Sequence, residues 1–168
     1  MKTRGADTTT IKMLLNSVVS TPNTRFITAD INNFYLNTEM EGPEYTMIQI
    51  NLTPQEIIEE CNVMEYVVNG LAYLEINKGL YGLPQSVNLA NDRLIKELSV
   101  KRFEPTNHTP GLWKQKTRPV TFALVVDDFG IKYIHKEDVK MLLNTLQQKY
   151  EAVSVDWSGK LFCGMNLE

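Results

Sequence analysis

Residues 122–133 read FALVVDDFGIKY, a run of five apolar residues followed by two acids and then an alternating segment. This pattern predicts a strand, a tight turn and a second strand. The carboxylates of Asp127 and Asp128 repel each other at the turn, and water or a divalent cation beside them would relieve this repulsion. A solvated turn is the simpler interpretation, because Asp favours turns through local hydrogen bonds. The choice between the two depends on what the rest of the chain brings to this turn.

The composition predicts one globular domain. Of the 168 residues, 43% are hydrophobic and 22% are charged, and the chain is long enough to bury a substantial core. No apolar run is long enough to cross a membrane, and the N-terminus lacks the apolar segment of a signal peptide. Cys61 and Cys163 are far apart, and neither has a partner at the spacing of a zinc site. We therefore expect an intracellular protein with reduced thiols and no membrane partner.

The charged residues are unevenly distributed along the chain, although the formal net charge is only −3. Residues 26–77 contain nine acids and no Lys or Arg, whereas residues 78–118 contain eight basic residues and three acids. The overall acidity argues against a freestanding nucleic-acid-binding protein, which is usually basic. The basic block still leaves room for a surface that contacts phosphates.

Periodicity and turn residues predict further helices and strands around the hairpin at residues 122–133. We expect helices at residues 7–20, 54–61, 87–101 and 137–150, and strands at residues 26–31, 45–52, 113–120 and 161–168. Asn69-Gly70 predicts another hairpin, and Thr53 with Glu56 predicts a capping box for the second helix. The fold class is therefore α+β, with helices packed on an antiparallel sheet.

Asp30 lies near the end of the strand expected at residues 26–31. An isolated acid at a strand end is most simply a cap or a surface residue. If this strand pairs with the hairpin, however, Asp30 meets Asp127 and Asp128. Two or three converging carboxylates bind Mg²⁺ ions in pairs about 4 Å apart, an arrangement that serves phosphoryl and nucleotidyl transfer.

Three stretches in this order resemble the motifs A, B and C of reverse transcriptases: DINNFYLN at residues 30–37, KGLYGLPQ at residues 78–85 and VVDD at residues 125–128. They are most similar to copia-type LTR retrotransposon polyproteins, in which DxxxAFLN, KxLYGLxQ and YVDD are typical. The closing LFCGM at residues 161–165 resembles the primer-grip strand of the same enzymes. The resemblance extends from about Thr8 to the end of the chain. It implies an RNA-directed DNA polymerase, and over residues 1–168 a palm with part of the fingers, truncated at both ends.

The resemblance also implies a catalytic site that holds two Mg²⁺ ions, with Mn²⁺ as a substitute. Asp30 and Asp127 would hold both metals, assisted by the backbone carbonyl of Ile31 and by the second acid, Asp128. The reaction would be transfer of a dNTP onto the 3′-OH of a primer on an RNA or DNA template. The cell compartment would be the cytoplasm, virus-like particles or the nucleus.

Three further sites follow from the same resemblance. Tyr35 matches the aromatic steric gate that excludes a ribose 2′-OH, and Gln85 matches the glutamine that contacts the incoming nucleotide. The primer 3′ end would be held by Phe162, Cys163, Gly164 and Met165. Simpler interpretations are core packing for Tyr35 and Phe162 and a loop hydrogen bond for Gln85.

The sequence also departs from the family pattern. Val125 replaces the usual aromatic residue of YVDD, and Phe34 stands where a small residue is common. The upstream fingers strands with their basic residues, the thumb and the RNase H domain are not matched by any part of the sequence. The alternative interpretation is therefore a catalytically inactive remnant of a retrotransposon polyprotein. We also expect exposed sheet edges that promote self-association.

Overall fold

The structure is a computed structural model that describes residues 5–167. Its helices are α1 (Thr8–Ser20), α2 (Gln55–Glu60), α3 (Pro84–Val100) and α4 (Lys136–Gln147). Its strands are β1 (Arg25–Ile31), β2 (Tyr45–Gln49), β3 (Val67–Val68), β4 (Leu71–Glu75), β5 (Phe103–Pro105), β6 (Leu112–Gln115), β7 (Val120–Val125), β8 (Asp128–Tyr133), β9 (Val153–Asp156), β10 (Leu161–Phe162) and β11 (Met165–Asn166). Helices are combined with antiparallel sheets, which confirms the predicted α+β class.

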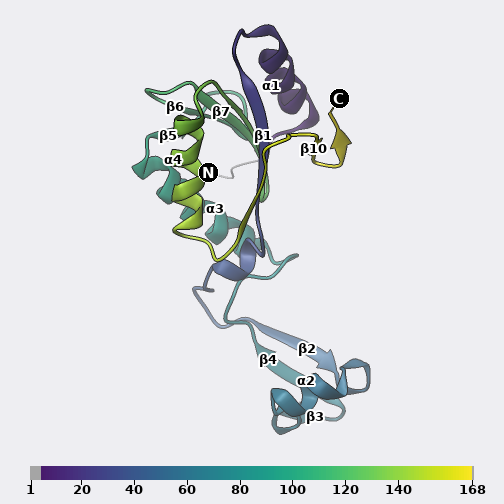
Figure 1. The fold of residues 1–168 in the computed structure, drawn as a ribbon. Coiled ribbons are helices and arrows are strands. Elements are labelled where there is room, and N and C mark those ends of the chain that lie inside the picture. The colour runs from purple at the N-terminus through teal and green to yellow at the C-terminus, as the bar shows by residue number, and fades with distance from the viewer. Residues whose placement is uncertain (1–4, 168) are drawn as a thin grey trace.

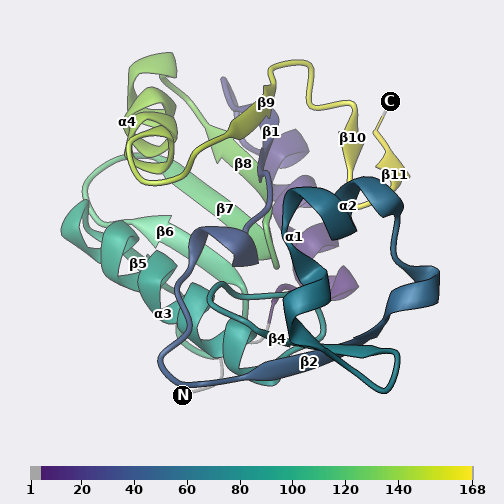
Figure 2. The same ribbon diagram turned by 90° about the horizontal axis from the view of Figure 1, so that it is seen from below.

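A six-stranded sheet with the order β5-β6-β7-β8-β1-β9 forms the body of the molecule. Helices α3 and α4 cover one face of this sheet, and α1 and the β10–β11 hairpin lie against the other face (Figure 1 and Figure 2). Strand β1 is the first in the chain, yet it is inserted between β8 and β9. The sheet therefore places a strand from the N-terminal part of the chain beside one from the C-terminal part.

Side chains of the central strands alternate between the two faces of the sheet. Ile27 of β1 and Phe129 and Ile131 of β8 belong to the core beneath α3 and α4. Phe26 points to the opposite face, where it packs with Phe162 and α1. Because both faces are covered, β7 contains a nearly continuous apolar run, as the sequence indicates.

Helix α1 begins where the sequence predicts. The carboxylate of Asp7 accepts a hydrogen bond from the backbone N–H of Thr10 at 2.7 Å, which is the expected N-cap contact. At the other end, the ammonium group of Lys132 on β8 donates to the Ser17 carbonyl and the Thr21 hydroxyl. A cation is favourable at a helix C-terminus, so Lys132 both caps α1 and attaches it to the sheet.

A second unit, residues 38–77, projects from the body and is called the arm below (Figure 1). It carries α2 and the three-stranded sheet β2-β4-β3. Asn69 and Gly70 form the predicted tight turn between β3 and β4, and their φ angles are 53° and 77°. The arm contains eight Glu and no Lys or Arg, so its charge is strongly negative.

Three of the expected elements are wrong in detail. The strand expected over residues 113–120 ends at Gln115, because residues 116–119 form the turn into β7. Thr53 does not cap α2, because a short 3-10 turn over Ile50–Leu52 directs its hydroxyl to the Gln49 carbonyl instead. The strand expected over residues 161–168 is a hairpin, since Cys163 and Gly164 have φ angles of 49° and 75° and reverse the chain. Residue 168 lies outside the described residues.

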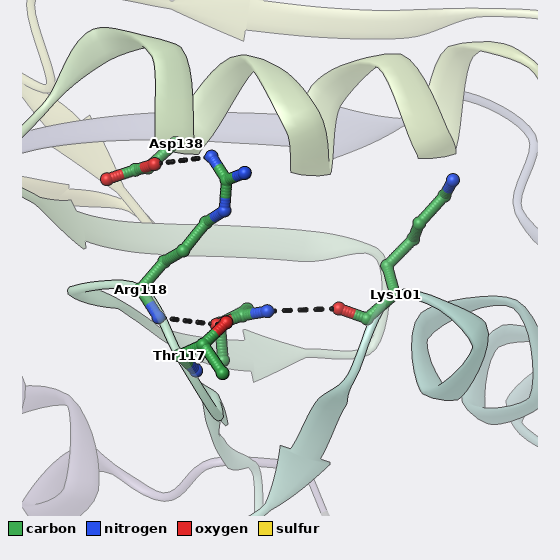
Figure 3. Close-up of polar contacts among 5 residues, drawn as sticks. Lys101, Thr117, Arg118 and Asp138 are labelled. Atoms are coloured by element: carbon green, nitrogen blue, oxygen red, sulfur yellow. Dashed lines mark hydrogen bonds and ion pairs between the residues drawn. The ribbon is translucent and has the colours of Figure 1, made fainter.

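Gln115 and Arg118 attach the turn between β6 and β7 to the two helices on one face of the sheet. The Gln115 side chain donates to the carbonyl of Lys101, which ends α3, and accepts from the backbone N–H groups of Thr117 and Arg118. Arg118 then forms an ion pair with Asp138 in the first turn of α4, with 2.6 Å between Nη1 and Oδ1 (Figure 3).

None of the described helices combines the length and the apolar character needed to cross a membrane.

Candidate active site

The pairing of β1 with β8 brings the predicted acidic residues together. In this register the Cα atoms of Asp30 and Asp128 are direct partners across the two strands. Asp127 precedes β8 in the hairpin turn, and its carbonyl accepts a hydrogen bond from the backbone N–H of Ile31 at 3.2 Å. Three of the residues predicted to hold metal therefore lie at one end of the sheet, with the backbone of Ile31 beside them.

The turn that carries Asp127 has an unusual backbone conformation. Val125 and Asp128 are paired, so the turn consists of Val126 and Asp127 alone. Val126 has a φ angle of 59°, a left-handed conformation that is rare for a β-branched side chain. Strained turns of this kind are often found at functional sites, and this one fixes the carboxylate that extends beyond the strand.

The three carboxylates affect one another electrostatically. Burial raises the pKa of Asp30, and the charges of Asp127 and Asp128 raise it further. Burial and the charge of Asp127 also raise the pKa of Asp128. Among residues 5–167, no Lys or Arg forms an ion pair with any of the three. Within the described part of the chain, no ion pair therefore compensates their negative charge.

Oxygen ligands of this kind suit hard divalent cations such as Mg²⁺, so the chemistry of the three carboxylates fits the predicted metal. Within the described part of the chain, however, no group of three or more His, Cys, Asp or Glu side chains is already arranged to hold a metal ion. The donors are therefore close together without forming a complete coordination shell. The two-metal site remains a prediction.

One carboxylate oxygen is occupied by a tyrosine that the sequence did not single out. The hydroxyl of Tyr81 donates a hydrogen bond to Oδ2 of Asp127 at 2.9 Å. The Tyr81 ring also meets the ring of Tyr35 edge-on, with 4.6 Å between the centroids. Tyr81 belongs to the resembling stretch at residues 78–85, but its contact with Asp127 spans 46 residues and no local pattern reveals it.

A cleft of about 390 Å³ opens beside the acidic residues. It is lined by Asp30 and Asp128, by Ser154 on β9, and by Cys163 and Gly164 of the C-terminal hairpin, together with neighbouring residues. Two of the residues predicted to hold the primer thus share a cleft with two of the predicted catalytic acids. The Cys163 thiol lies 3.9 Å from Oδ2 of Asp128, and burial together with that carboxylate raises the thiol pKa to about 11.

Phe162 and Met165 have a different environment from the other two predicted primer-grip residues. Phe162 is only 2% exposed and packs edge-on against Phe26 in the core under α1. Met165 packs partly buried against the same core. Packing accounts for Phe162, as the simpler interpretation expects, and it holds the hairpin in position.

Tyr35 and Gln85 lie outside the cleft. Tyr35 is 6% exposed and lines a separate small cavity with Val87, Trp113 and other residues. Gln85 donates from Nε2 to the carboxylate of Glu44, beside a hollow formed by residues 40–44 and the start of α3. Tyr35 and Gln85 therefore do not line the cleft that contains Asp30 and Asp128. The Gln85 side chain instead makes a hydrogen bond to a loop residue, which is the simpler interpretation given above for this glutamine.

The sequence missed a fourth acid that borders the cleft. Asp156 lies on β9, which pairs with β1, and it lines the cleft with Asp30. Its carboxylate accepts from the backbone N–H and the hydroxyl of Ser158, and these hydrogen bonds lower its pKa. The carboxylate of Asp156 is thus hydrogen-bonded within its own turn.

No protein-family model matches the chain. Its structure is similar to that of telomerase from Candida albicans, solved in complex with the TWJ fragment of telomeric RNA. The sequence identity is 11% and the TM-score is 0.47. The similarity covers 91% of this chain and 31% of the telomerase chain, so the chain spans about a third of the length of that protein.

Proposed function

We propose that the chain is the palm of an RNA-directed DNA polymerase of the copia-type retrotransposon class. The observation that carries this proposal is the pairing of Asp30 with Asp128 beside Asp127. These acids come from two of the three stretches that resemble polymerase motifs, and they are distant in sequence. The sequence resemblance and the pairing of these residues in the sheet both favour the same site.

In this proposal Asp30, Asp127 and Asp128 hold two Mg²⁺ ions with the carbonyl of Ile31. When bound, such ions make a primer hydroxyl more nucleophilic and stabilise the leaving pyrophosphate. The protein contributes carboxylates whose mutual repulsion favours cation binding. The cleft beside them offers a place for the primer terminus, with Cys163 and Gly164 on its wall.

The partners in this proposal are a dNTP and a primed RNA or DNA template. Tyr35 and Gln85 would contact the nucleotide only after a rearrangement, because Tyr35 is covered by Tyr81 and Gln85 is bonded to Glu44. We also propose that β5 and β9, the edge strands of the six-stranded sheet, support self-association.

Incorporation of a labelled dNTP on a primed RNA template tests the proposal directly. Asp127→Asn removes a charge that both metals require, so we expect near-complete loss of incorporation with a melting temperature no lower than that of wild type. Asp92→Asn on the exposed side of α3 is the matched control and should retain full activity. Equal incorporation by wild type and Asp127→Asn would contradict the proposal.

A catalytically inactive remnant is the second candidate. It is favoured by the incomplete metal coordination within residues 5–167 and by the absence of Tyr35 and Gln85 from the lining of the cleft. Absence of incorporation by these 168 residues, together with retained Mn²⁺ binding, would support it. Incorporation by the chain alone would refute it.

A further inference from the structure

Tyr81 stands between the acidic residues and the predicted steric gate. Its hydroxyl donates to Oδ2 of Asp127, and its ring packs edge-on against Tyr35. Burial and the contact with Asp127 raise the Tyr81 pKa to about 12, so the phenol is a protonated donor at neutral pH. The side chain is nevertheless 58% exposed, so surrounding atoms do not confine it to this position.

The loop that carries Tyr81 is anchored at both ends and open at its tip. Before Tyr81, the N–H of Gly79 donates to the Thr38 carbonyl and the N–H of Leu80 donates to the Ser86 hydroxyl. A Cβ at position 79 would lie 2.7 Å from the Tyr35 carbonyl, so this anchor requires glycine. After Tyr81, Gly82 has a φ angle of 95° and no atom within 4 Å of the position that a Cβ would take. Across this tip the backbone N–H of Leu83 donates a long hydrogen bond of 3.3 Å to the Leu80 carbonyl. The tip can therefore move while its bases stay in place.

A cation bound at Asp127 would compete with this hydrogen bond. The Tyr81 hydroxyl already holds one lone pair of Oδ2, so a cation that coordinates through this lone pair must displace the hydroxyl, whereas a cation on Oδ1 alone would leave the hydrogen bond in place. The same movement that frees this oxygen would withdraw the ring from Tyr35. The position of the Tyr81 side chain thus depends on whether Asp127 binds a cation, and it determines how exposed the predicted gate residue Tyr35 is.

We propose that Tyr81 is a latch that keeps the site closed in the absence of metal, and that binding of a divalent cation at Asp127 releases it and uncovers Tyr35. This inference rests on the proposed function, because it concerns the same three acids. It assigns to Tyr81 a positioning role that neither packing nor solubility requires. Nucleotide binding would then follow metal binding in order.

The Tyr81→Phe variant tests the latch without removing the ring. We expect this variant to bind Mn²⁺ about two- to tenfold more tightly than wild type, the range that corresponds to one net hydrogen bond. Free Mn²⁺ is measured by electron paramagnetic resonance, which needs no catalytic turnover. Tyr73→Phe is the matched control, because Tyr73 is an exposed tyrosine on the arm and should leave the affinity unchanged.

A second measurement follows the rings directly. In a chain with ¹³C-labelled tyrosine, Mg²⁺ should shift the signals of Tyr81 and Tyr35 together, and Asp127→Asn should abolish both shifts. Equal or weaker Mn²⁺ binding by Tyr81→Phe, with wild type still binding, would overturn the latch and leave the metal site standing. Absence of Mn²⁺ binding by both proteins would overturn the metal site itself.

Discussion

Asp30 and Asp128 lie directly opposite each other on paired strands, where like charges destabilise a sheet. Burial and neighbouring charges raise the pKa of Asp30, so the folded protein holds a proton at this carboxyl more tightly than the unfolded chain. The associated stability is present in acid and is lost as the pH rises through the raised pKa. At neutral pH the ionised pair therefore opposes folding.

We predict that Asp30→Asn raises the melting temperature at pH 7, because it removes this repulsion. The difference from wild type should vanish below about pH 3, where the carboxyl is protonated in both the folded and the unfolded state. Thermal unfolding followed by circular dichroism at both pH values measures this.

Asp156→Asn is a control for which we expect the opposite change in melting temperature at pH 7. Hydrogen bonds from Ser158 lower the pKa of Asp156, so its stabilising effect is present at neutral pH and is lost as the pH falls through the lowered value. This variant should melt lower than wild type at pH 7. A lower melting temperature for Asp30→Asn at pH 7 would contradict the electrostatic account.

At the level of single residues, the sequence predicted the convergence of the acids better than it predicted the contacts of the loop side chains. Asp30 and Asp127 adjoin strands whose apolar runs are readable, so the pairing of these strands could be expected. The contacts of Tyr81 with Asp127 and of Gln85 with Glu44 join residues more than 40 positions apart. Such contacts depend on how loops lie in space, and local patterns do not contain that information.

The β10–β11 hairpin is attached to the sheet by an aromatic ring that lies over a glycine. A Cβ at position 130 would approach the Phe162 ring to 2.7 Å, so the hairpin can dock only because β8 has no side chain there. The docked hairpin places Cys163 and Gly164 on the wall of the cleft. The shape of the candidate site thus depends on Gly130.

We predict that Gly130→Ala destabilises the protein by about 1–3 kcal/mol, because the added methyl group overpacks the contact with Phe162. Urea unfolding measures the loss. Gly42→Ala is the control, since no atom lies within 4 Å of the added Cβ and the change should be small. The double variant Gly130→Ala/Phe162→Leu should lose less than the sum of the two single variants; strict additivity would refute the direct contact.

Among the elements, the sequence predicted the long helices well and the C-terminal hairpin poorly. The buried stripe of α4, including Val139, Leu142 and Leu146, follows the helical period that the sequence shows. The turn at Cys163 and Gly164 was missed because cysteine carries no turn preference and each flanking strand has only two residues. Short strands that are fixed by tertiary packing leave little periodicity to detect.

The whole molecule combines a strongly acidic arm with a body whose sheet has two open edges. The arm has eight Glu and no basic residue, whereas the net charge of the chain is only −3, so the rest of the chain is net positive. Met47 and Tyr73 are cross-strand partners on an exposed face of the arm. These surfaces and the open edges favour association of the isolated chain.

We therefore predict that the mass measured by light scattering rises with protein concentration. Ser154→Lys places a charge on the edge strand β9 and should reduce this association. Ser99→Lys adds the same charge on exposed α3 and should leave the association unchanged. A monomer at all concentrations for wild type would contradict the proposal that the sheet edges associate.

The insertion of β1 between β8 and β9 has a consequence for the order of folding. The β7–β8 hairpin and the arm are built from contacts between near neighbours in the chain, which form early. Asp30 and Asp128 are about a hundred residues apart, and closing a loop of that length is slow. Nascent or partly folded chains can therefore acquire most of their secondary structure while the acids remain separated. In pulsed hydrogen exchange, we expect the amides of β1 to gain protection after those of the β7–β8 hairpin.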